Sequence, residues 1–126
     1  MQKKVVLKKC LKCNAMVEVI KPCLCKDCSF TCCGEPMQDV SENFKDFSFE
    51  KHVPTYKIKE DKIVVSVNHV MEPEHFIEWI AIKNEEEKHI KYLKPNTQAV
   101  VEFDLIENAV LYAYCNIHGL WSAKVE

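Results

Sequence analysis

Residues 110–125 read VLYAYCNIHGLWSAKV, a stretch that is typical of two β-strands joined by one tight loop. The two flanking runs, Val110–Cys115 and Leu120–Val125, are rich in aromatic and branched apolar residues, which favour extended backbone. Asn116 and Gly119 lie between the runs, and both residue types are common in turns. We therefore predict a strand on either side of a short connection.

Five earlier runs have the same character, and they are Tyr56–Lys59, Lys62–Val67, Phe76–Lys83, His89–Leu93 and Ala99–Asp104. The first two flank an acidic turn at Glu60 and Asp61 and predict a hairpin. Short runs at this spacing, separated by Pro, Asn and acidic turns, predict a mainly β protein built as an antiparallel β-sandwich. No helix of convincing length is predicted, because Asn84–Lys91 has a partly helical composition but fits a solvated turn equally well.

The cysteines divide the chain of 126 residues into two parts, since seven of the eight lie between Cys10 and Cys33 and the eighth is Cys115. We predict a small Cys-rich module over residues 1–40 and a larger domain over residues 41–126. A module of this length cannot bury a stabilising core, so bound metal is expected to supply much of its folding energy. Residues 38–49, QDVSENFKDFSF, have the composition of a connection.

The net charge of −2 is distributed unevenly between these two parts. Residues 1–40 carry seven Lys against four acidic residues, and residues 41–126 carry ten Lys against fifteen. The chain contains no Arg, the residue that most often reads guanine and a favoured partner of phosphate. These features argue against a nucleic-acid partner.

The N-terminus, MQKKVVLKKC, has lysines but no apolar run of signal-peptide length, and no later segment has the length of a membrane span. We therefore expect a soluble, cytoplasmic protein with no membrane partner. Clustered cysteines in a reducing cytosol more often hold metal than form disulfides.

Four of the five histidines lie beside turn or strand-end signals, and they are His52, His69, His75 and His118. Cys115 precedes His118 by three residues, a spacing that lets one tight loop present both side chains to a single metal. Structural zinc is usually held by four ligands, so a set of four His and one Cys favours iron with an open sixth position. Taken singly, each histidine is more often a surface residue, and a single buried Cys is usually inert.

The stretches EKHVP (residues 50–54), MEPEHFIEW (residues 71–79) and CNIHGLW (residues 115–121) together resemble the superoxide reductase family, also called desulfoferrodoxins and neelaredoxins. The resemblance implies an immunoglobulin-like β-sandwich. It also implies a ferrous iron with four imidazoles in a plane and an axial thiolate. Carried onto this sequence, the planar ligands are His52, His69, His75 and His118, and the axial ligand is Cys115.

The activity that the resemblance implies is the one-electron reduction of superoxide to hydrogen peroxide without release of dioxygen. Lys51 would face the open position and attract the anion. Glu50 resembles the residue that occupies the sixth position once the iron is oxidised. His89 matches no ligand position and is expected on the surface.

The N-terminal part resembles the desulforedoxin-like module of the two-iron members of this family. The matching residues are Cys10, Cys13, Cys32 and Cys33, which would hold a second iron that relays electrons. Gly34 and Gly119 each follow a ligand motif, where glycine lets the backbone turn closely around a metal.

The sequence departs from the family pattern in KPCLCKDCSFT, which adds Cys23, Cys25 and Cys28 between the two cysteine pairs. A [4Fe–4S] cluster that draws on some of these cysteines is therefore a rival to a mononuclear iron, since such clusters also take four thiolates. A zinc site with spare thiols is a third possibility.

Three functions compete at this level. The leading one is a superoxide reductase that receives electrons from rubredoxin or a similar small carrier, and the resemblance implies a homodimer. The second is a redox or metal carrier that uses the Cys-rich module alone. This hypothesis does not explain the EKHVP and CNIHG stretches. The third is a zinc-ribbon interaction or nucleic-acid module, which the missing Arg and the acidic larger domain oppose.

Overall fold

The computed structural model describes residues 6–26, 29–43 and 52–126. The chain separates into two compact units, Lys3–Ser41 and Glu42–Glu126. All regular structure in the described residues is β-strand, so the prediction of a mainly β protein without helices is confirmed for this part of the chain. None of the described segments is a helix that could cross a membrane.

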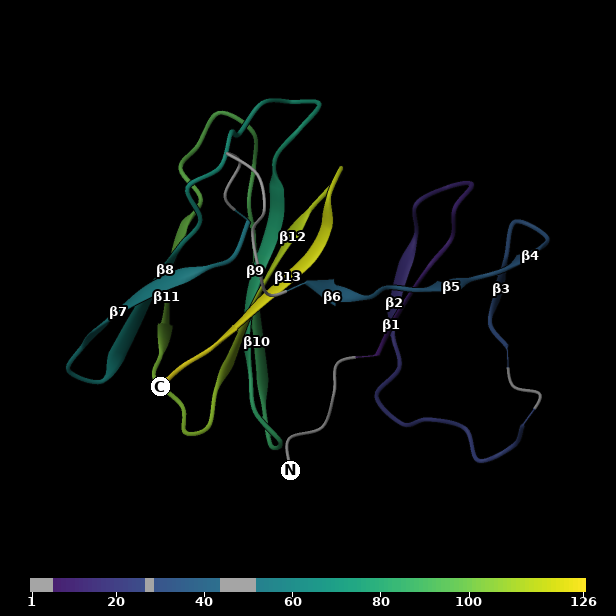
Figure 1. The fold of residues 1–126 in the computed structure, drawn as a ribbon, viewed down its shortest axis with the longest axis horizontal. Helices are drawn as coiled ribbons and strands as arrows, with labels where there is room; N and C mark the ends of the chain where they lie inside the picture. Colours follow the sequence, from purple (N-terminus) through teal and green to yellow (C-terminus); the bar gives the residue numbers. More distant parts are fainter. Residues whose placement is uncertain (1–5, 27–28, 44–51) are drawn as a thin grey trace. The chain divides into compact units, whose positions relative to one another are not determined.

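The larger unit contains two sheets that lie against each other (Figure 1). One sheet has the strand order β10-β9-β12-β13-β6 and the other has the order β11-β8-β7. Their strands are β6 (Glu42–Asn43), β7 (Thr55–Lys59), β8 (Lys62–Ser66), β9 (Ile77–Lys83), β10 (Lys88–Tyr92), β11 (Val100–Asp104), β12 (Val110–Cys115) and β13 (Gly119–Lys124). All neighbouring strands are antiparallel except β13 and β6, which are parallel. This is the antiparallel β-sandwich that was predicted.

The strands β7 to β13 lie within one residue of the predicted runs at each end. The predicted hairpin is β7–β8, and Glu60 in its turn has a positive φ of 57°. Asn84 begins a turn rather than a helix, because its side-chain oxygen accepts hydrogen bonds from the backbone N–H groups of Glu86 and Glu87. Side chains of this kind favour turns over helices.

The core lies between the two sheets and contains Ile63, Val65, Ile80, Ile82 and Leu111, all fully buried. Burial of large aliphatic side chains is the main stabilising term for such a sandwich. Cys115 also belongs to this core and is fully buried. It shares the inner face of β12 with Leu111 because alternate residues of a strand face the same side.

The ladder between β12 and β9 has a register shift at its end. Tyr114 pairs with Trp79, but Cys115 pairs with Ile77, so Glu78 is an extra residue on β9. An extra residue of this kind is a β-bulge and re-aims the side chains beyond it. Ile77 and Ile80 therefore both reach the core although they are three residues apart.

The boundary between the two units lies within residues 38–49, the predicted connection, but this stretch is not without regular structure. β5 (Gln38–Asp39) and β6 (Glu42–Asn43) are short strands within that stretch. β6 is held by its partner β13: the Asn43 side chain donates to the Leu120 carbonyl (3.2 Å), and the Ser122 hydroxyl donates to the Glu42 carboxylate (3.0 Å). These bonds depend on residues about 80 positions away, so local composition does not reveal them.

The smaller unit has two short sheets, with strand orders β2-β1-β5 and β3-β4. Its remaining strands are β1 (Leu7–Lys9), β2 (Met16–Glu18), β3 (Thr31–Cys32) and β4 (Glu35–Pro36). Leu7 and Cys10 are its only buried hydrophobic residues among those described. So small a core supports the expectation that another interaction stabilises this unit.

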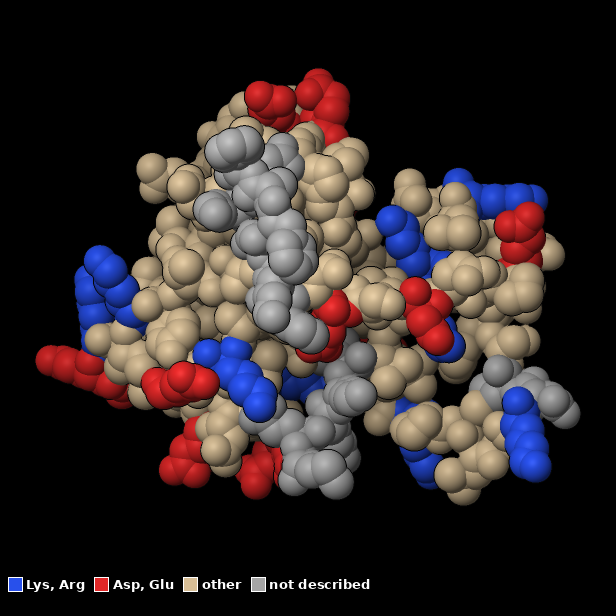
Figure 2. Space-filling view, viewed as in Figure 1, with Lys and Arg blue, Asp and Glu red and all other residues tan. Residues whose placement is uncertain are grey.

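Charged side chains are spread over the surface in small groups of both signs (Figure 2). One ion pair joins Lys62 on β8 to Asp104, its partner residue on β11. The ammonium of Lys62 lowers the pKa of the Asp104 carboxyl, and Asp104 in turn raises the pKa of Lys62. Exposed pairs of this kind contribute little to stability.

Candidate metal centres

Five side chains of the sandwich meet at one end of it, although four separate segments carry them. His52 lies three residues before β7, and His69 lies in the loop that follows β8. His75 ends a tight turn before β9, and the hairpin β12–β13 carries Cys115 and His118. Each side chain offers one ligand atom, and these five atoms all lie within 4.8 Å of one another.

The turn that carries His75 is closed by a pair of backbone hydrogen bonds. The Glu72 N–H donates to the His75 carbonyl and the His75 N–H donates to the Glu72 carbonyl, both at 3.0 Å. Pro73 follows Glu72, and proline favours such turns because its ring fixes φ. The hairpin turn is also defined, because Gly119 has a φ of +87°, a conformation that side chains disfavour.

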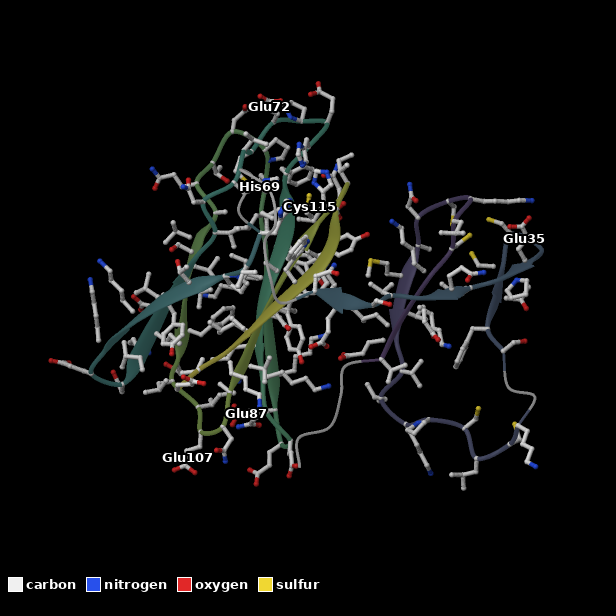
Figure 3. The ribbon with its side chains drawn as sticks, in the orientation of Figure 1. Glu35, His69, Glu72, Glu87, Glu107 and Cys115 are labelled. Carbon is white, nitrogen blue, oxygen red and sulfur yellow. The ribbon has the colours of Figure 1, made fainter. Side chains whose placement is uncertain are left out.

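The four imidazole rings form a closed square. The ring centroids of consecutive members, in the order His52, His69, His75, His118 and back to His52, lie 4.7, 4.6, 5.0 and 4.9 Å apart. The sulfur of Cys115 lies 3.6 Å from His69 Nε2 and 3.7 Å from His118 Nδ1. Figure 3 labels His69 and Cys115 at this end of the sandwich.

The hydrogen bonds indicate which atom of each group faces the centre. His69 Nδ1 lies 2.6 Å from the Val70 carbonyl. A carbonyl only accepts, so Nδ1 carries the proton and Nε2 is left as the ligand atom. His52 Nε2 lies 3.1 Å from His118 Nδ1, and these two nitrogens face each other. The His118 backbone N–H donates to the Cys115 sulfur (3.4 Å), which favours the thiolate.

These distances fit a single metal ion. Imidazole nitrogen binds such ions at about 2.1 Å, so adjacent ligands around an octahedral ion are about 3.0 Å apart and opposite ones about 4.2 Å. The separation of 3.1 Å between His52 and His118 matches the shorter value, and the overall limit of 4.8 Å leaves room for the longer one. Neutral imidazoles and a thiolate suit late transition metals, including iron.

Trp121 on β13 orients two of these histidines. Its indole ring stacks on His52, with ring centroids 4.6 Å apart and planes 16° from parallel. Its indole N–H donates to the His118 carbonyl at 3.1 Å. Contacts around the ligands set the ring orientation in metal sites. The CNIHGLW stretch was quoted for its resemblance, but no role for Trp121 was predicted from the sequence.

Two further residues of the prediction, Glu50 and Lys51, lie outside the described residues. His89 is exposed on β10 and lies 2.7 Å from the Glu87 carboxylate. It is therefore a surface residue, as predicted. The structure brings together all five residues that were expected to be ligands, and the proposal of an iron site is taken up below.

A second group of four sulfurs lies in the smaller unit and consists of Cys10, Cys13, Cys32 and Cys33. Cys13 and Cys32 have sulfurs 3.6 Å apart, and those of Cys32 and Cys33 are 3.9 Å apart. A tetrahedral ion with metal–sulfur bonds of about 2.3 Å requires sulfurs about 3.8 Å apart. The four sulfurs therefore fit a single tetrahedral ion.

The two loops that present these sulfurs need left-handed backbone. Asn14 and Cys33 have φ values of 66° and 54°, and Gly34 has a φ of +77°. The Asn14 N–H donates to the Cys10 carbonyl (2.9 Å), which closes the first loop. Asn and Gly adopt this conformation at low cost, so the prediction that Gly34 marks a tight turn is confirmed.

The thiols of this group differ in acidity. The Cys13 backbone N–H donates to the Cys10 sulfur and lowers the pKa of the Cys10 thiol to about 7. The Cys13 side chain hydrogen-bonds the Cys32 thiol and raises the pKa of Cys32 to about 12. Metal binding needs thiolates, and the lowered pKa of Cys10 favours its thiolate near neutral pH.

The two additional cysteines that the structure describes lie outside this group. Cys25 is exposed and free, whereas Cys23 is disulfide-bonded, and neither belongs to the four-sulfur group. Cys28 lies outside the described residues. The expectation that clustered cysteines avoid disulfides is therefore wrong for Cys23. Sequence spacing alone does not decide which of several close cysteines share a site.

Fold and sites together define a metal-binding β-sandwich protein with a separate Cys-rich unit. The family model described as Desulfoferrodoxin matches residues 44–124. This chain belongs to that family. The chain is 39% identical over 119 residues to a desulfoferrodoxin homolog of Archaeoglobus fulgidus, and the match covers 91% of this chain and 93% of the relative.

Two further similarities extend the comparison. A protein of Pyrococcus horikoshii named superoxide reductase is 34% identical over 104 residues, which cover 64% of this chain and 90% of that protein. The crystal structure of the superoxide reductase from Treponema pallidum superposes with a TM-score of 0.76 at 24% identity and covers 96% of this chain and 98% of that one. At this identity the structural likeness concerns the fold, and it supports the immunoglobulin-like sandwich.

The acidity of Cys10 gives a test on metal-free protein. We expect the thiolate absorbance near 240 nm to rise with a first midpoint near pH 7, because Cys10 is protonated below that pH and ionised above it. Cys10→Ser should remove this step, whereas Cys25→Ser, which changes an exposed free thiol outside the group, should retain it. Absence of any thiolate signal below pH 8 in the unaltered chain would contradict the assignment.

Proposed function

We propose that this protein is a superoxide reductase that converts superoxide to hydrogen peroxide by one-electron reduction at an iron held by the five-membered His/Cys group. The observation that carries the proposal is the closed square of four imidazoles with the Cys115 sulfur in contact with two of them. Membership of the desulfoferrodoxin family and the superoxide reductases among the similar proteins support it.

The reaction consumes superoxide, one electron and two protons and yields one hydrogen peroxide. Iron in this site would supply the electron, and a thiolate ligand favours its transfer to the substrate. Zinc has no redox chemistry, so the same ligands loaded with zinc would be inactive. We therefore propose that His52, His69, His75, His118 and Cys115 would hold an iron ion, with Cys115 as its thiolate ligand.

Each residue of the site has a physical role in this proposal. His52 and Cys115 are buried, so they exclude water from one side of the centre. His118 is exposed, which leaves the centre accessible from its own side. The His118 backbone N–H stabilises negative charge on the Cys115 sulfur.

The positive charge of Lys51 is suited to attracting the anionic substrate. Exposed acidic residues, including Glu72 and Glu74, lie near the end of the sandwich that carries the site (Figure 3). Carboxylates repel an anionic substrate, so a cation beside the site would raise the rate of encounter. We propose that Lys51 attracts superoxide and orders a proton-donating water, and that Glu50 occupies the sixth position of the oxidised iron.

The Cys-rich unit would relay electrons as a rubredoxin-like centre with Cys10, Cys13, Cys32 and Cys33. Their separations favour a mononuclear ion over a [4Fe–4S] cluster, in which each thiolate binds a different iron and the sulfurs are farther apart. The proposed electron donor is rubredoxin or another small carrier, and the proposed assembly is a homodimer.

The products of the reaction test the function. With superoxide and a reductant in excess, we expect about one hydrogen peroxide per superoxide and no dioxygen. Cys115→Ser should abolish the reduction, because the thiolate ligand is lost, while the circular dichroism of the β-sandwich is retained. Dioxygen release would indicate a dismutase instead, and full activity of Cys115→Ser would refute the ligand assignment.

The proposed role of Lys51 predicts how the rate of reaction with superoxide depends on ionic strength. Lys51→Ala should slow the second-order reaction with superoxide and weaken its dependence on ionic strength, because a charge beside the site is removed. Lys88→Ala is the matched control, since it removes one positive charge beside Glu87, which Figure 3 labels at the other end of the sandwich. Equal rates for Lys51→Ala and the unaltered protein across ionic strength would exclude the steering role.

Metal analysis tests the nature of the N-terminal centre. For protein purified without oxygen, we expect about two irons and no acid-labile sulfide per chain, as one ion at each centre requires. About five irons with four sulfides would instead establish a [4Fe–4S] cluster in the Cys-rich unit. Zinc at both centres, with no iron, would contradict the proposed function itself.

A further inference from the structure

We propose that Asn116 is a positioning residue that holds His75 in the metal centre. The inference rests on the proposed function, because it takes the His/Cys group as a metal site. Asn116 lies directly after Cys115 in the hairpin loop and is partly buried. It belongs to the CNIHGLW stretch, but no role beyond that of a turn residue was predicted for it from the sequence.

Three hydrogen bonds join Asn116 to the two residues that flank His75. Its side-chain oxygen accepts from the Phe76 backbone N–H at 3.0 Å, and its side-chain NH₂ donates to the Glu74 carbonyl at 2.9 Å. Its own backbone N–H donates to the Phe76 carbonyl at 3.2 Å. The backbone on both sides of His75 is therefore hydrogen-bonded to Asn116.

These bonds continue a strand ladder beyond the point where it ends. The last paired residues of β12 and β9 are Cys115 and Ile77, just past the register shift at Glu78. A bulge disrupts the ladder locally and bends its strand, so the segment before Ile77 lacks the support of regular pairing. The Asn116 amide supplies one donor and one acceptor there, which replaces a pair of backbone groups.

The hydrogen bonds of Asn116 also connect ligands that come from different parts of the chain. Cys115 and His118 belong to the hairpin, whereas His75 comes from a turn about 40 residues earlier. That turn is closed by a pair of bonds between Glu72 and His75. Asn116 thus fixes the distance between the hairpin ligands and His75, whose ring lies 5.0 Å from that of His118.

Preorganised ligands bind metal more tightly than ligands that must first be ordered. Loss of a group that orients a ligand typically costs 10–100-fold in metal affinity or activity. We therefore expect removal of the Asn116 side chain to weaken the metal centre without removing any ligand. The other three imidazoles keep their own contacts, such as the stacking of Trp121 on His52.

Asn84 provides a matched control within the same sandwich. Its side-chain NH₂ donates to the Glu107 carbonyl at 2.9 Å, and its oxygen accepts from the N–H groups of Glu86 and Glu87. Figure 3 labels Glu87 and Glu107 at the end of the sandwich opposite His69 and Cys115. Asn84→Ala therefore removes comparable bonds far from the centre.

The experiment uses the full chain, with cobalt(II) as the probe. A tetrathiolate centre and a five-ligand His/Cys centre absorb at different wavelengths, so the two sites are followed separately while a chelator competes for the metal. Asn116→Ala should lower the cobalt affinity of the His/Cys centre about 10–100-fold, change its absorption spectrum and leave the tetrathiolate bands unchanged. Asn84→Ala should lower the unfolding temperature but leave both spectra and affinities unchanged.

Asn116→Asp provides a second variant should Asn116→Ala fail to fold. It keeps an acceptor for the Phe76 N–H but loses the donor to the Glu74 carbonyl, so we expect a smaller loss of affinity than in Asn116→Ala. Unaltered affinity and spectrum in either folded Asn116 variant would overturn the inference, as would an equal affinity loss in Asn84→Ala. An unaltered protein that binds cobalt but does not reduce superoxide when loaded with iron would contradict the proposed function alone.

Discussion

Five donor atoms at one end of the sandwich lie within 4.8 Å of one another, and the rest of the larger unit has to maintain that separation. Nitrogen lone pairs directed at one point repel each other unless a proton or a metal ion lies between them. Groups that are not ligands hold them in place: the Val70 carbonyl, the Trp121 indole and the Asn116 side chain. The apolar core beneath, with Ile77 and Cys115 fully buried, prevents the segments from moving apart.

The two centres are supported in different ways. The His/Cys centre lies on a sandwich whose core exists without it, so its ligands are preorganised. The four sulfurs lie on a unit with only Leu7 and Cys10 buried among its described hydrophobic residues, so a metal bound there would contribute directly to its folding. Local backbone geometry compensates in part, because Asn14, Cys33 and Gly34 adopt left-handed conformations that shape the cysteine loops before metal binds.

Much of the fold was predictable because strands leave a local signal. The strands from Thr55 onward were located to within one residue, since runs of branched and aromatic residues alternate with turn residues. The two-residue strand Glu42–Asn43 was missed, because it depends on pairing with the distant strand β13 and on side-chain bonds to Leu120 and Ser122. The register shift at Glu78 was also invisible, because it is defined by the pairing of two strands and not by either strand alone.

From the sequence by itself, the family resemblance carried by EKHVP and CNIHG indicated the chemical nature of the two groups and the five candidate ligands of the main one. Only the tertiary structure decided that the Cys-rich unit brings together four cysteines, with Cys23 in a disulfide and Cys25 outside the group. It also decided which nitrogen of His69 faces the centre and which side chains hold the ligands. The reason is physical: several of these contacts join residues far apart in the chain, such as Asn116 with Glu74, and such contacts form only when the sheets pack.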